Sequence, residues 1–192
     1  TPPQGCADYA FQQHIMRSLN PETGRSVVLW PHGVLFRDSE AGIRKRMIEE
    51  DYVDAVIGLG KNLFYNSSME SCLLICRMKK PNERKGKIIF IDAKEELRIE
   101  RTNAWLEPQH IKKISDAYWK FKDTEGFAKV ANNKEVLENN GNLSIQLYVK
   151  QAANAIEHNT EELIADVKAG QAQINASLEN LFAQLKNIGI EI

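Results

Sequence analysis

Apolar runs separated by polar turns predict a β-sheet in the first hundred residues. Each run is four to eight residues long and rich in Val, Ile or Leu, as strands are. The runs lie at residues 25–30, 52–59, 71–77 and 87–92. The first of them is continuously apolar from Val27 to Trp30, which predicts a strand that is covered on both faces.

A helical pattern lies between the first two runs. It begins at Asp38-Ser39, and Ile43, Met47 and Ile48 fall on one side of it. Two strands joined through a helix usually run parallel. The basic cluster 44–46 is followed by three acidic residues, so we expect it to lie on a solvated face of the helix.

The remaining connections are of other kinds. The charged turn at residues 79–86 is short, so the third and fourth strands are expected to pair as an antiparallel hairpin. Further along, Pro108 opens a helical pattern that runs to Phe121. A short edge strand is predicted at 127–131, and the alternating pattern at 143–149 predicts an extended segment.

Beyond Asn159 the apolar positions follow a heptad pattern. They are separated by seven, four, three, four and three residues, and they are Val167, Ile174, Leu178, Leu181, Leu185 and Ile188. Such a seam is typical of a helix that packs against another helix. The pattern breaks at Gly170-Gln171, so about two good heptads are expected, with the helix ending near Gly189. The alternative is a helix that covers a sheet edge.

Composition narrows the class of protein. The formal net charge is −1 over 192 residues, which does not indicate a strongly basic nucleic-acid-binding domain but leaves room for a local basic patch. The three cysteines form no framework, so we expect buried thiols in a reducing cytoplasm and neither disulfides nor zinc. No apolar stretch is long enough to span a membrane, and no signal peptide is visible. The chain opens without Met, as a processed product or an internal piece of a longer chain would.

Two turns follow predicted strands and carry unusual residues. In open α/β sheets, ligands bind beyond the carboxyl ends of the strands. Pro31-His32-Gly33 follows the first strand, where Gly33 is expected to supply a special backbone angle. His32 either lines a site or forms a hydrogen bond that holds the turn. Phe64 and Tyr65 follow the second strand; they either pack under the loop or offer a flat wall to a planar ligand such as a base. No complete set of catalytic residues and no metal-binding set is visible.

A series of motifs follows in order along the chain: Asp8-Tyr9-Ala10-Phe11, Val28 to Arg37, Gly42-Ile43-Arg44, Asp54 to Leu59, Asn62 to Tyr65, Gly86 to Ala93, and Asn142 to Ile145 with Tyr148-Val149. Together these motifs resemble a known family, the modification (M) subunits of type I restriction-modification systems, which are adenine-specific DNA methyltransferases. The chain differs from the usual pattern at Gly60, near which the family usually has Pro, and at 67–71, where the family has a Thr-Gly-Ile-Pro-Ala-like stretch.

The resemblance implies a chemistry of which this chain holds only part. The family transfers a methyl group from S-adenosylmethionine to the amino group of an adenine that is flipped out of the duplex. Its cofactor motif and catalytic Asn-Pro-Pro-Phe have no counterpart here, and Pro2-Pro3 is not that motif, because no Asn precedes it. We therefore expect no catalytic residue in this chain and no activity from it alone.

The resemblance also implies roles for the candidate residues. Phe64 matches the aromatic residue that stacks against the flipped base, with Tyr65 as its neighbour and His32-Gly33 beside them. DNA, the specificity (S) subunit and the restriction (R) subunit are the implied partners. The heptad positions fit a helix that packs against the S subunit, and the unpaired sheet edge leaves room for self-association.

The expected fold is therefore α/β: the later half of a Rossmann-like methyltransferase sheet, mixed and with an antiparallel hairpin, followed by C-terminal helices. Its expected parts are residues 1–125 of the methyltransferase domain, a connecting segment at 126–158 and a helical tail for docking at 159–192. The main alternative is a split or truncated interaction module without catalysis, which supplies a docking helix. An unrelated small α/β hydrolase or nucleotide-binding enzyme is disfavoured, because no nucleophile and base are paired in the sequence.

Overall fold

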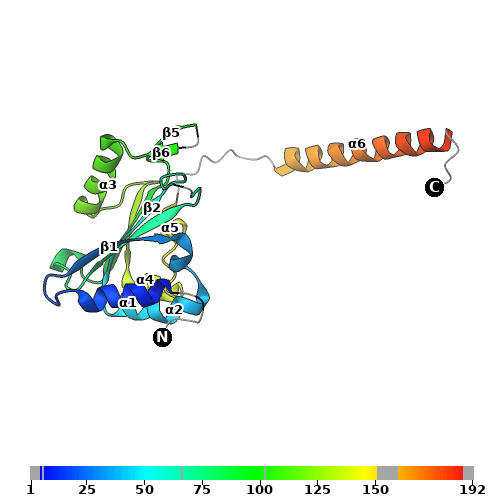
Figure 1. Ribbon diagram of the computed structural model, residues 1–192. Helices are drawn as coiled ribbons and strands as arrows, with labels where there is room; N and C mark the ends of the chain where they lie inside the picture. The colour runs from blue at the N-terminus through cyan, green and yellow to red at the C-terminus, as the bar shows by residue number, and fades with distance from the viewer. Residues whose placement is uncertain (1–4, 6, 66, 102, 151–159, 188–192) are drawn as a thin grey trace. The chain divides into compact units, whose positions relative to one another are not determined.

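The computed structural model describes residues 5, 7–65, 67–101, 103–150 and 160–187, and it divides into two compact units, residues 1–152 and 153–192. The first unit is a mixed β-sheet with helices on both faces (Figure 1). Its helices are α1 (Asp8–Ser18), α2 (Ala41–Glu49), α3 (Pro108–Lys120), α4 (Asn133–Glu138) and α5 (Ile145–Tyr148), with short 3-10 turns η1 (His32–Leu35), η2 (Asp38–Glu40) and η3 (Asn82–Arg84). Its strands are β1 (Arg25–Pro31), β2 (Val53–Leu59), β3 (Ser71–Arg77), β4 (Lys87–Ala93), β5 (Arg98–Glu100), β6 (Asn103–Trp105) and β7 (Ala128–Asn132).

The five main strands lie in the order β1-β3-β2-β4-β7. β3 pairs antiparallel with both β1 and β2, and β2 pairs parallel with β4. β1 and β2 therefore run in the same direction, as expected, but β3 lies between them. The expected antiparallel hairpin is present, and its strands are β2 and β3. The predicted pairing of β3 with β4 is wrong, because β2 separates these two strands.

Two apolar layers hold the helices on the sheet. On one face, Met16 of α1, Ile48 of α2 and Val136 of α4 pack over Val56 and Leu74. On the other face, α3 packs over β2 and β4. β2 is buried at every position, as a central apolar strand should be. The mixed α/β fold class predicted from the sequence is confirmed.

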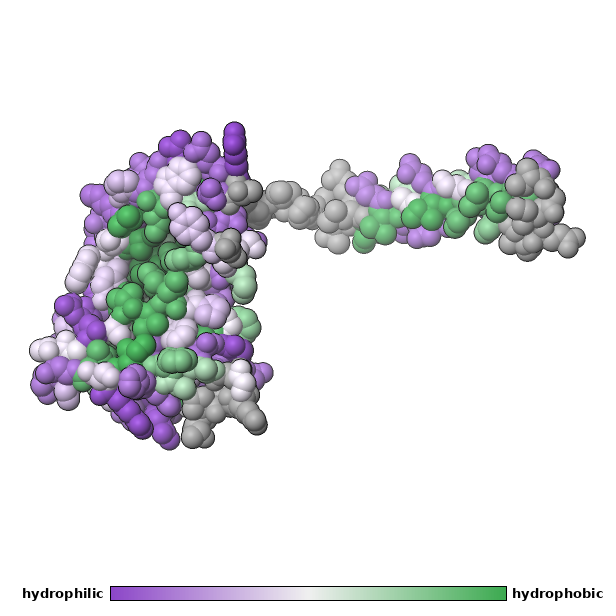
Figure 2. All heavy atoms as spheres, viewed as in Figure 1, coloured by the Kyte–Doolittle hydropathy of each residue, from purple (hydrophilic) through white to green (hydrophobic). Residues whose placement is uncertain are grey.

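β1 differs from the expected doubly covered strand. Val27 and Leu29 are 61% and 41% exposed, so that prediction is wrong. They point to the face that α3 covers farther along the sheet, where no described element lies over β1. Figure 2 shows a band of apolar residues on this unit. β1 pairs only with β3 among the described residues, so its other edge is free there.

Two local predictions fail for tertiary reasons. Residues 143–149 are not extended, because Ile145–Tyr148 form α5, in which the Tyr148 ring stacks on Phe90 at 4.0 Å between centroids. Arg44 does not lie on a solvated face but is 1% exposed. Its guanidinium donates hydrogen bonds to the carbonyl oxygens of Gly141, Val34 and Arg37 at 3.0, 3.3 and 2.7 Å.

The second unit contains one described element, the helix α6 (Thr160–Asn187). The helix continues without interruption through Gly170 and Gln171. In the described part of the chain, no helix combines the length and hydropathy needed to cross a membrane.

Candidate functional site

The candidate residues lie at the carboxyl edge of the sheet, which we define as the edge where β1, β2 and β4 end and β3 begins. β1 ends at Pro31 opposite Ser71, the first residue of β3. Leu59, the last residue of β2, lies opposite the same Ser71. The loop after β2 and the turn after β1 therefore leave the sheet on either side of the start of β3. This arrangement brings both predicted turns to one edge.

His32 connects the turn after β1 to the start of β3. It is half-buried, and its Nε2 lies 2.9 Å from the carbonyl oxygen of Ser71. Because a carbonyl oxygen only accepts, Nε2 carries the proton in this hydrogen bond. The bond fixes the turn after β1 to the first residue of β3. Between the two roles left open by the sequence, the geometry supports the one that holds the turn.

Gly33 does not supply a special backbone angle. Its φ lies outside the left-handed region, so that expectation is wrong. A Cβ built on it would lie 3.5 Å from the guanidinium carbon of Arg37, which is ordinary contact. Arg37 pairs with Asp8 and, at 2.8 Å, with the buried Glu40. Gly33 thus lies under a guanidinium that two carboxylates hold.

The side chains of Phe64 and Tyr65 are not buried in the core. Phe64 is 40% exposed and Tyr65 is fully exposed. The loop that carries them is fixed by its backbone, because Phe64 accepts a hydrogen bond from the Ser67 amide at 3.2 Å. Neither ring packs under the loop as a buried side chain would. An exposed pair of aromatic rings at the carboxyl edge can offer a flat face to a planar ligand.

The start of this loop is tightly packed. A Cβ built on Gly60 would lie 2.1 Å from the Leu97 side chain and 2.3 Å from the carbonyl oxygen of Lys94. Asn62 has a φ of 61°. Its carbonyl oxygen accepts a hydrogen bond from the Ala104 amide at 3.1 Å. The loop that bears Phe64 and Tyr65 therefore packs against the segment that follows β4.

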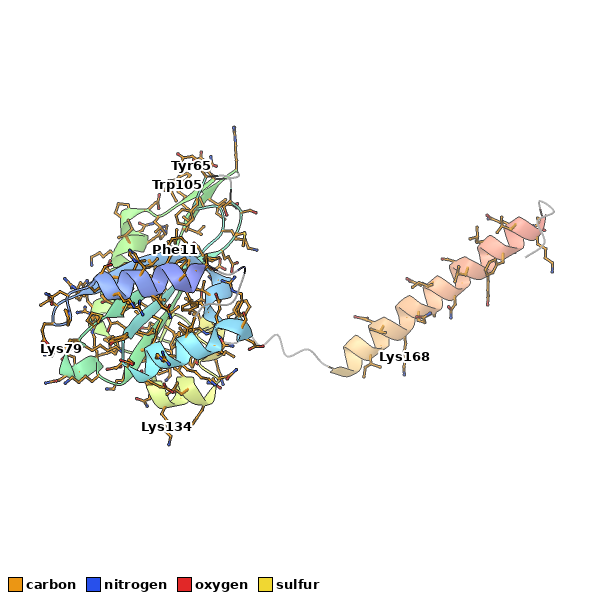
Figure 3. The ribbon with its side chains drawn as sticks, turned by 60° about the horizontal axis from the view of Figure 1, so that its bottom comes forward. Phe11, Tyr65, Lys79, Trp105, Lys134 and Lys168 are labelled. Atoms are coloured by element: carbon orange, nitrogen blue, oxygen red, sulfur yellow. The ribbon has the colours of Figure 1, made fainter. Side chains whose placement is uncertain are left out.

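Sequence reasoning missed that segment. It contains the two-stranded hairpin β5–β6, in which Arg98 pairs with Trp105. In Figure 3, Trp105 and Tyr65 lie at the same end of the unit, and Lys134 lies at the other end. Strands of three residues are too short to show a periodic pattern. A lone Trp after a run of charged residues is the signal that the sequence offers.

The cysteines behave as buried thiols. Cys72 and Cys76 are free and fully buried. Burial raises the pKa of each thiol to about 12. Within the described residues, no group of three or more His, Cys, Asp or Glu side chains could hold a metal ion. Cys6 lies outside the described residues.

α6 exposes the predicted seam. Val167, Ile174, Leu178 and Leu181 are exposed, and Leu185 is half-buried. Ile188 lies outside the described residues. Ile164 and Phe182 are exposed as well and extend the apolar stripe, which Figure 2 shows along the helix. Sequence reasoning left these two residues out, although Ile164 lies three positions before Val167 and fits the same spacing.

Of the candidate residues, His32, Gly33, Phe64 and Tyr65 line none of five cavities found in the described part of the chain, whereas Ile174, Leu178 and Leu181 line a shallow hollow on α6. A cavity of about 630 Å³ lies instead beside β7, where residues 123–126 meet residues 147–150. The aromatic residues therefore form an open surface at the carboxyl edge and not the wall of a closed pocket.

Comparison with known proteins gives a consistent picture. A family model described as N-6 DNA methylase matches residues 1–157. The chain is 38% identical over 153 residues to the Type I restriction enzyme MjaVIII methylase subunit of Methanocaldococcus jannaschii, covering 77% of this chain and 26% of that protein. It is 31% identical over 196 aligned residues to the Type I restriction enzyme MpnII methylase subunit of Mycoplasma pneumoniae, covering 98% of this chain and 36% of that protein.

A solved structure agrees with these relatives. The crystal structure of the type I restriction-modification system methyltransferase subunit from Streptococcus thermophilus superposes with a TM-score of 0.72 at 37% identity. The match covers 77% of this chain and 31% of that one. The chain thus spans about a quarter to a third of the length of each of these three proteins.

Proposed function

The chain belongs to the N-6 DNA methylase family, and from this premise we propose that it forms part of the modification subunit of a type I restriction-modification system. The whole subunit would transfer a methyl group from S-adenosylmethionine to the amino group of an adenine in a specific DNA site. The match to a family model over most of the chain carries this proposal. The functional division into residues 1–125, 126–158 and 159–192 stays a prediction.

Within that subunit, Phe64 is proposed as the wall against which the extruded adenine stacks. Its ring is partly exposed at the carboxyl edge, on a loop that Gly60 and Asn62 hold against the following segment. Stacking of a base on an aromatic side chain contributes roughly 1–3 kcal/mol. Tyr65 is the neighbouring alternative. His32 and Gly33 support the edge, His32 through its hydrogen bond to Ser71.

We propose that this chain does not form a site for S-adenosylmethionine by itself. The carboxyl edge is open, and His32, Gly33, Phe64 and Tyr65 line none of the five cavities described above. No step of methyl transfer is therefore assigned to a residue of this chain. The chain alone is proposed to bind the cofactor weakly and to leave DNA unmethylated.

An activity assay tests the role of Phe64. The chain is combined with a polypeptide that contains the cofactor motif and Asn-Pro-Pro-Phe of the family, and transfer of a labelled methyl group to adenine is measured. Phe64→Ala should lower the rate at least tenfold, while Phe64→Trp should keep most of it, since a larger ring still stacks. Leu147→Ala, at an exposed apolar residue of α5, is the matched control. Full activity of Phe64→Ala would exclude the stacking role.

A second candidate function is a non-catalytic interaction module, which α6 favours. Its exposed apolar stripe is typical of a helix that docks on another helix. The proposed partner is the S subunit, and the R subunit and DNA complete the proposed assembly. Replacing Leu178 and Leu181 with Asp should abolish capture of the S subunit, whereas Asp at the exposed Ala176 should not. Capture that survives the double substitution would remove α6 from this interface.

The free edge of β1 is proposed as a contact for another chain or for a second copy. Unpaired strand edges readily accept further strands. Val27 and Leu29 add exposed apolar side chains beside that edge. A cytoplasmic location is also proposed, since the thiols of Cys72 and Cys76 are unpaired and buried.

A further inference from the structure

The hairpin β5–β6 and the loop that carries Phe64 form one continuous surface. The Ala104 amide of β6 donates a hydrogen bond to the Asn62 carbonyl oxygen at 3.1 Å. Just before the hairpin, Leu97 packs against Gly60 so closely that no Cβ fits between them. The hairpin is therefore positioned by the same loop that places Phe64 and Tyr65.

Trp105 is presented outward from this surface. Successive side chains of a strand point to opposite sides. Ala104 points inward and is buried, while Trp105 on the other side is 36% exposed. Its cross-strand partner Arg98 holds its guanidinium carbon 5.5 Å from the indole centre. Glu107 pairs with Arg98 at 3.0 Å and so fixes the cation over the ring.

The charges around the hairpin do not favour a groove that follows phosphates. Arg98 is paired with Glu107, and Glu96 with Lys113. Lys94 is paired with Asp92, and Glu95 and Glu100 outnumber Arg101, so the segment has no excess of positive charge. Stacking of a base on an aromatic ring does not need a positive field. The chemistry of this surface therefore suits a base more than a phosphate.

We propose that Trp105 is a second nucleic-acid contact, which stacks on a base next to the adenine held by Phe64. This inference rests on the proposed function and extends its site to the hairpin β5–β6. Extrusion of one base removes a stacking partner from its neighbours. An aromatic side chain beside the pocket can replace that lost contact.

Binding of a fluorescein-labelled, adenine-containing single-stranded 12-mer to the full chain tests this contact by fluorescence anisotropy. Trp105→Ala should raise the Kd roughly tenfold, and Trp105→Phe should restore most of the affinity. The matched control is Trp119→Ala, because Trp119 is 62% exposed and lies beside Arg84 near the opposite edge of the sheet. This control should bind as the unaltered chain does.

Phe64→Ala separates failure of this inference from failure of the proposed function. If Phe64→Ala weakens binding and Trp105→Ala does not, the hairpin contact is overturned and the base site remains. If neither substitution changes binding, or if the unaltered chain does not bind the strand, both are overturned. If circular dichroism shows that Trp105→Ala is unfolded, tryptophan fluorescence tests the contact instead. The fluorescence of Trp105 is then obtained as the difference between the unaltered chain and Trp105→Phe, with and without the strand. Quenching of the Trp105 contribution by the strand supports the contact, and its absence excludes it.

Discussion

The two edges of the central sheet are built in opposite ways. At the amino edge, where β2 and β4 begin, the carboxylate of Asp54 is fully buried. Its Oδ2 accepts hydrogen bonds from Arg77 at 2.9 Å, Arg84 at 3.0 Å and Tyr118 at 2.7 Å. The Arg84 guanidinium also lies 4.5 Å from the centre of the Phe121 ring. The buried charges of this edge are therefore paired within the chain.

The carboxyl edge does not bury its distinctive side chains in this way. Phe64, Tyr65 and Trp105 are all at least partly exposed, and backbone contacts of the loop and hairpin hold them in place. Buried charges are tolerated only when they are paired, so the amino edge contributes to one fixed fold. Exposed aromatic surface adds little to the stability of the chain, so these residues are better explained by a ligand that binds them. The comparison separates a stabilising edge from a binding edge.

Asp54→Asn should produce the largest loss of stability. The substitution removes the negative charge that the buried Arg84 and the partly buried Arg77 share, and breaking a buried ion pair from one side costs roughly 3–5 kcal/mol. Urea unfolding followed by circular dichroism measures the effect. The control is Asp123→Asn, whose carboxylate pairs with Lys129 at the surface and should cost about 1 kcal/mol or less. Equal losses in the two variants would contradict the central role of Asp54.

Alkaline pH should weaken the sheet between the two edges. Cys76 lies near the amino edge and Cys72 near the carboxyl edge, and burial raises the pKa of both thiols from 9.0 to about 12. Above pH 9 the unfolded chain releases protons that the folded chain retains, so stability falls as pH rises toward 12. Each thiol contributes up to about 1.4 kcal/mol per pH unit.

The unfolding free energy in urea at pH 8 and pH 10.5 measures this dependence. The chain with both Cys72→Ala and Cys76→Ala should start less stable at pH 8, because the substitutions leave small cavities. Its further loss toward pH 10.5 should be smaller than that of the unaltered chain. An identical loss in both chains would assign the pH dependence to other groups, of which the buried Tyr9, with its raised pKa, is the first to consider.

Gly60→Ala should damage the binding edge through its packing. A methyl group at this position would meet the Leu97 side chain and the Lys94 carbonyl oxygen, so the loop and the following segment must move apart. Overpacking of this kind costs about 1–3 kcal/mol. Gly42→Ala is the matched control, since nothing lies within 4 Å of its added methyl group, and alanine in a helix gains about 0.5–1 kcal/mol over glycine. Gly60→Ala should lower the melting temperature and Gly42→Ala should raise it. A change in the same direction in both variants would contradict the tight packing of the loop.

The sequence predicted the positions of the main strands because each carries its own apolar pattern. It did not predict their pairing, since the insertion of β3 between β1 and β2 depends on contacts between distant segments. Arg44 shows the same limit. Beside Lys45 and Arg46 it looks like a solvated residue, but one of its acceptors is Gly141, which lies 97 positions away. A local pattern carries no information about such an acceptor.

The candidate site was predictable in part for related reasons. His32 and Phe64 follow apolar strands, and the carboxyl ends of such strands are a general place for ligands. Trp105 lies in a three-residue strand that shows no period, so its place beside Phe64 appears only in the fold. The spacing that predicts residues 143–149 as a strand fits α5 as well, because Ile145 and Tyr148 are three positions apart and both face the core.

The smallest expected effect, and the most direct comparison of the two edges, comes from removing one hydroxyl at each. At the amino edge, Tyr118 donates a hydrogen bond to Asp54 and accepts one from Arg77 at 3.0 Å, so Tyr118→Phe should cost about 1.5 kcal/mol. At the carboxyl edge, Tyr65 is fully exposed, and Tyr65→Phe should change the unfolding free energy by less than about 0.5 kcal/mol. Because the chemical change is the same, urea unfolding of the two variants compares the edges alone. If Tyr65→Phe proved as costly as Tyr118→Phe, the carboxyl edge would also be a stabilising one, and its aromatic residues would need no ligand to explain them.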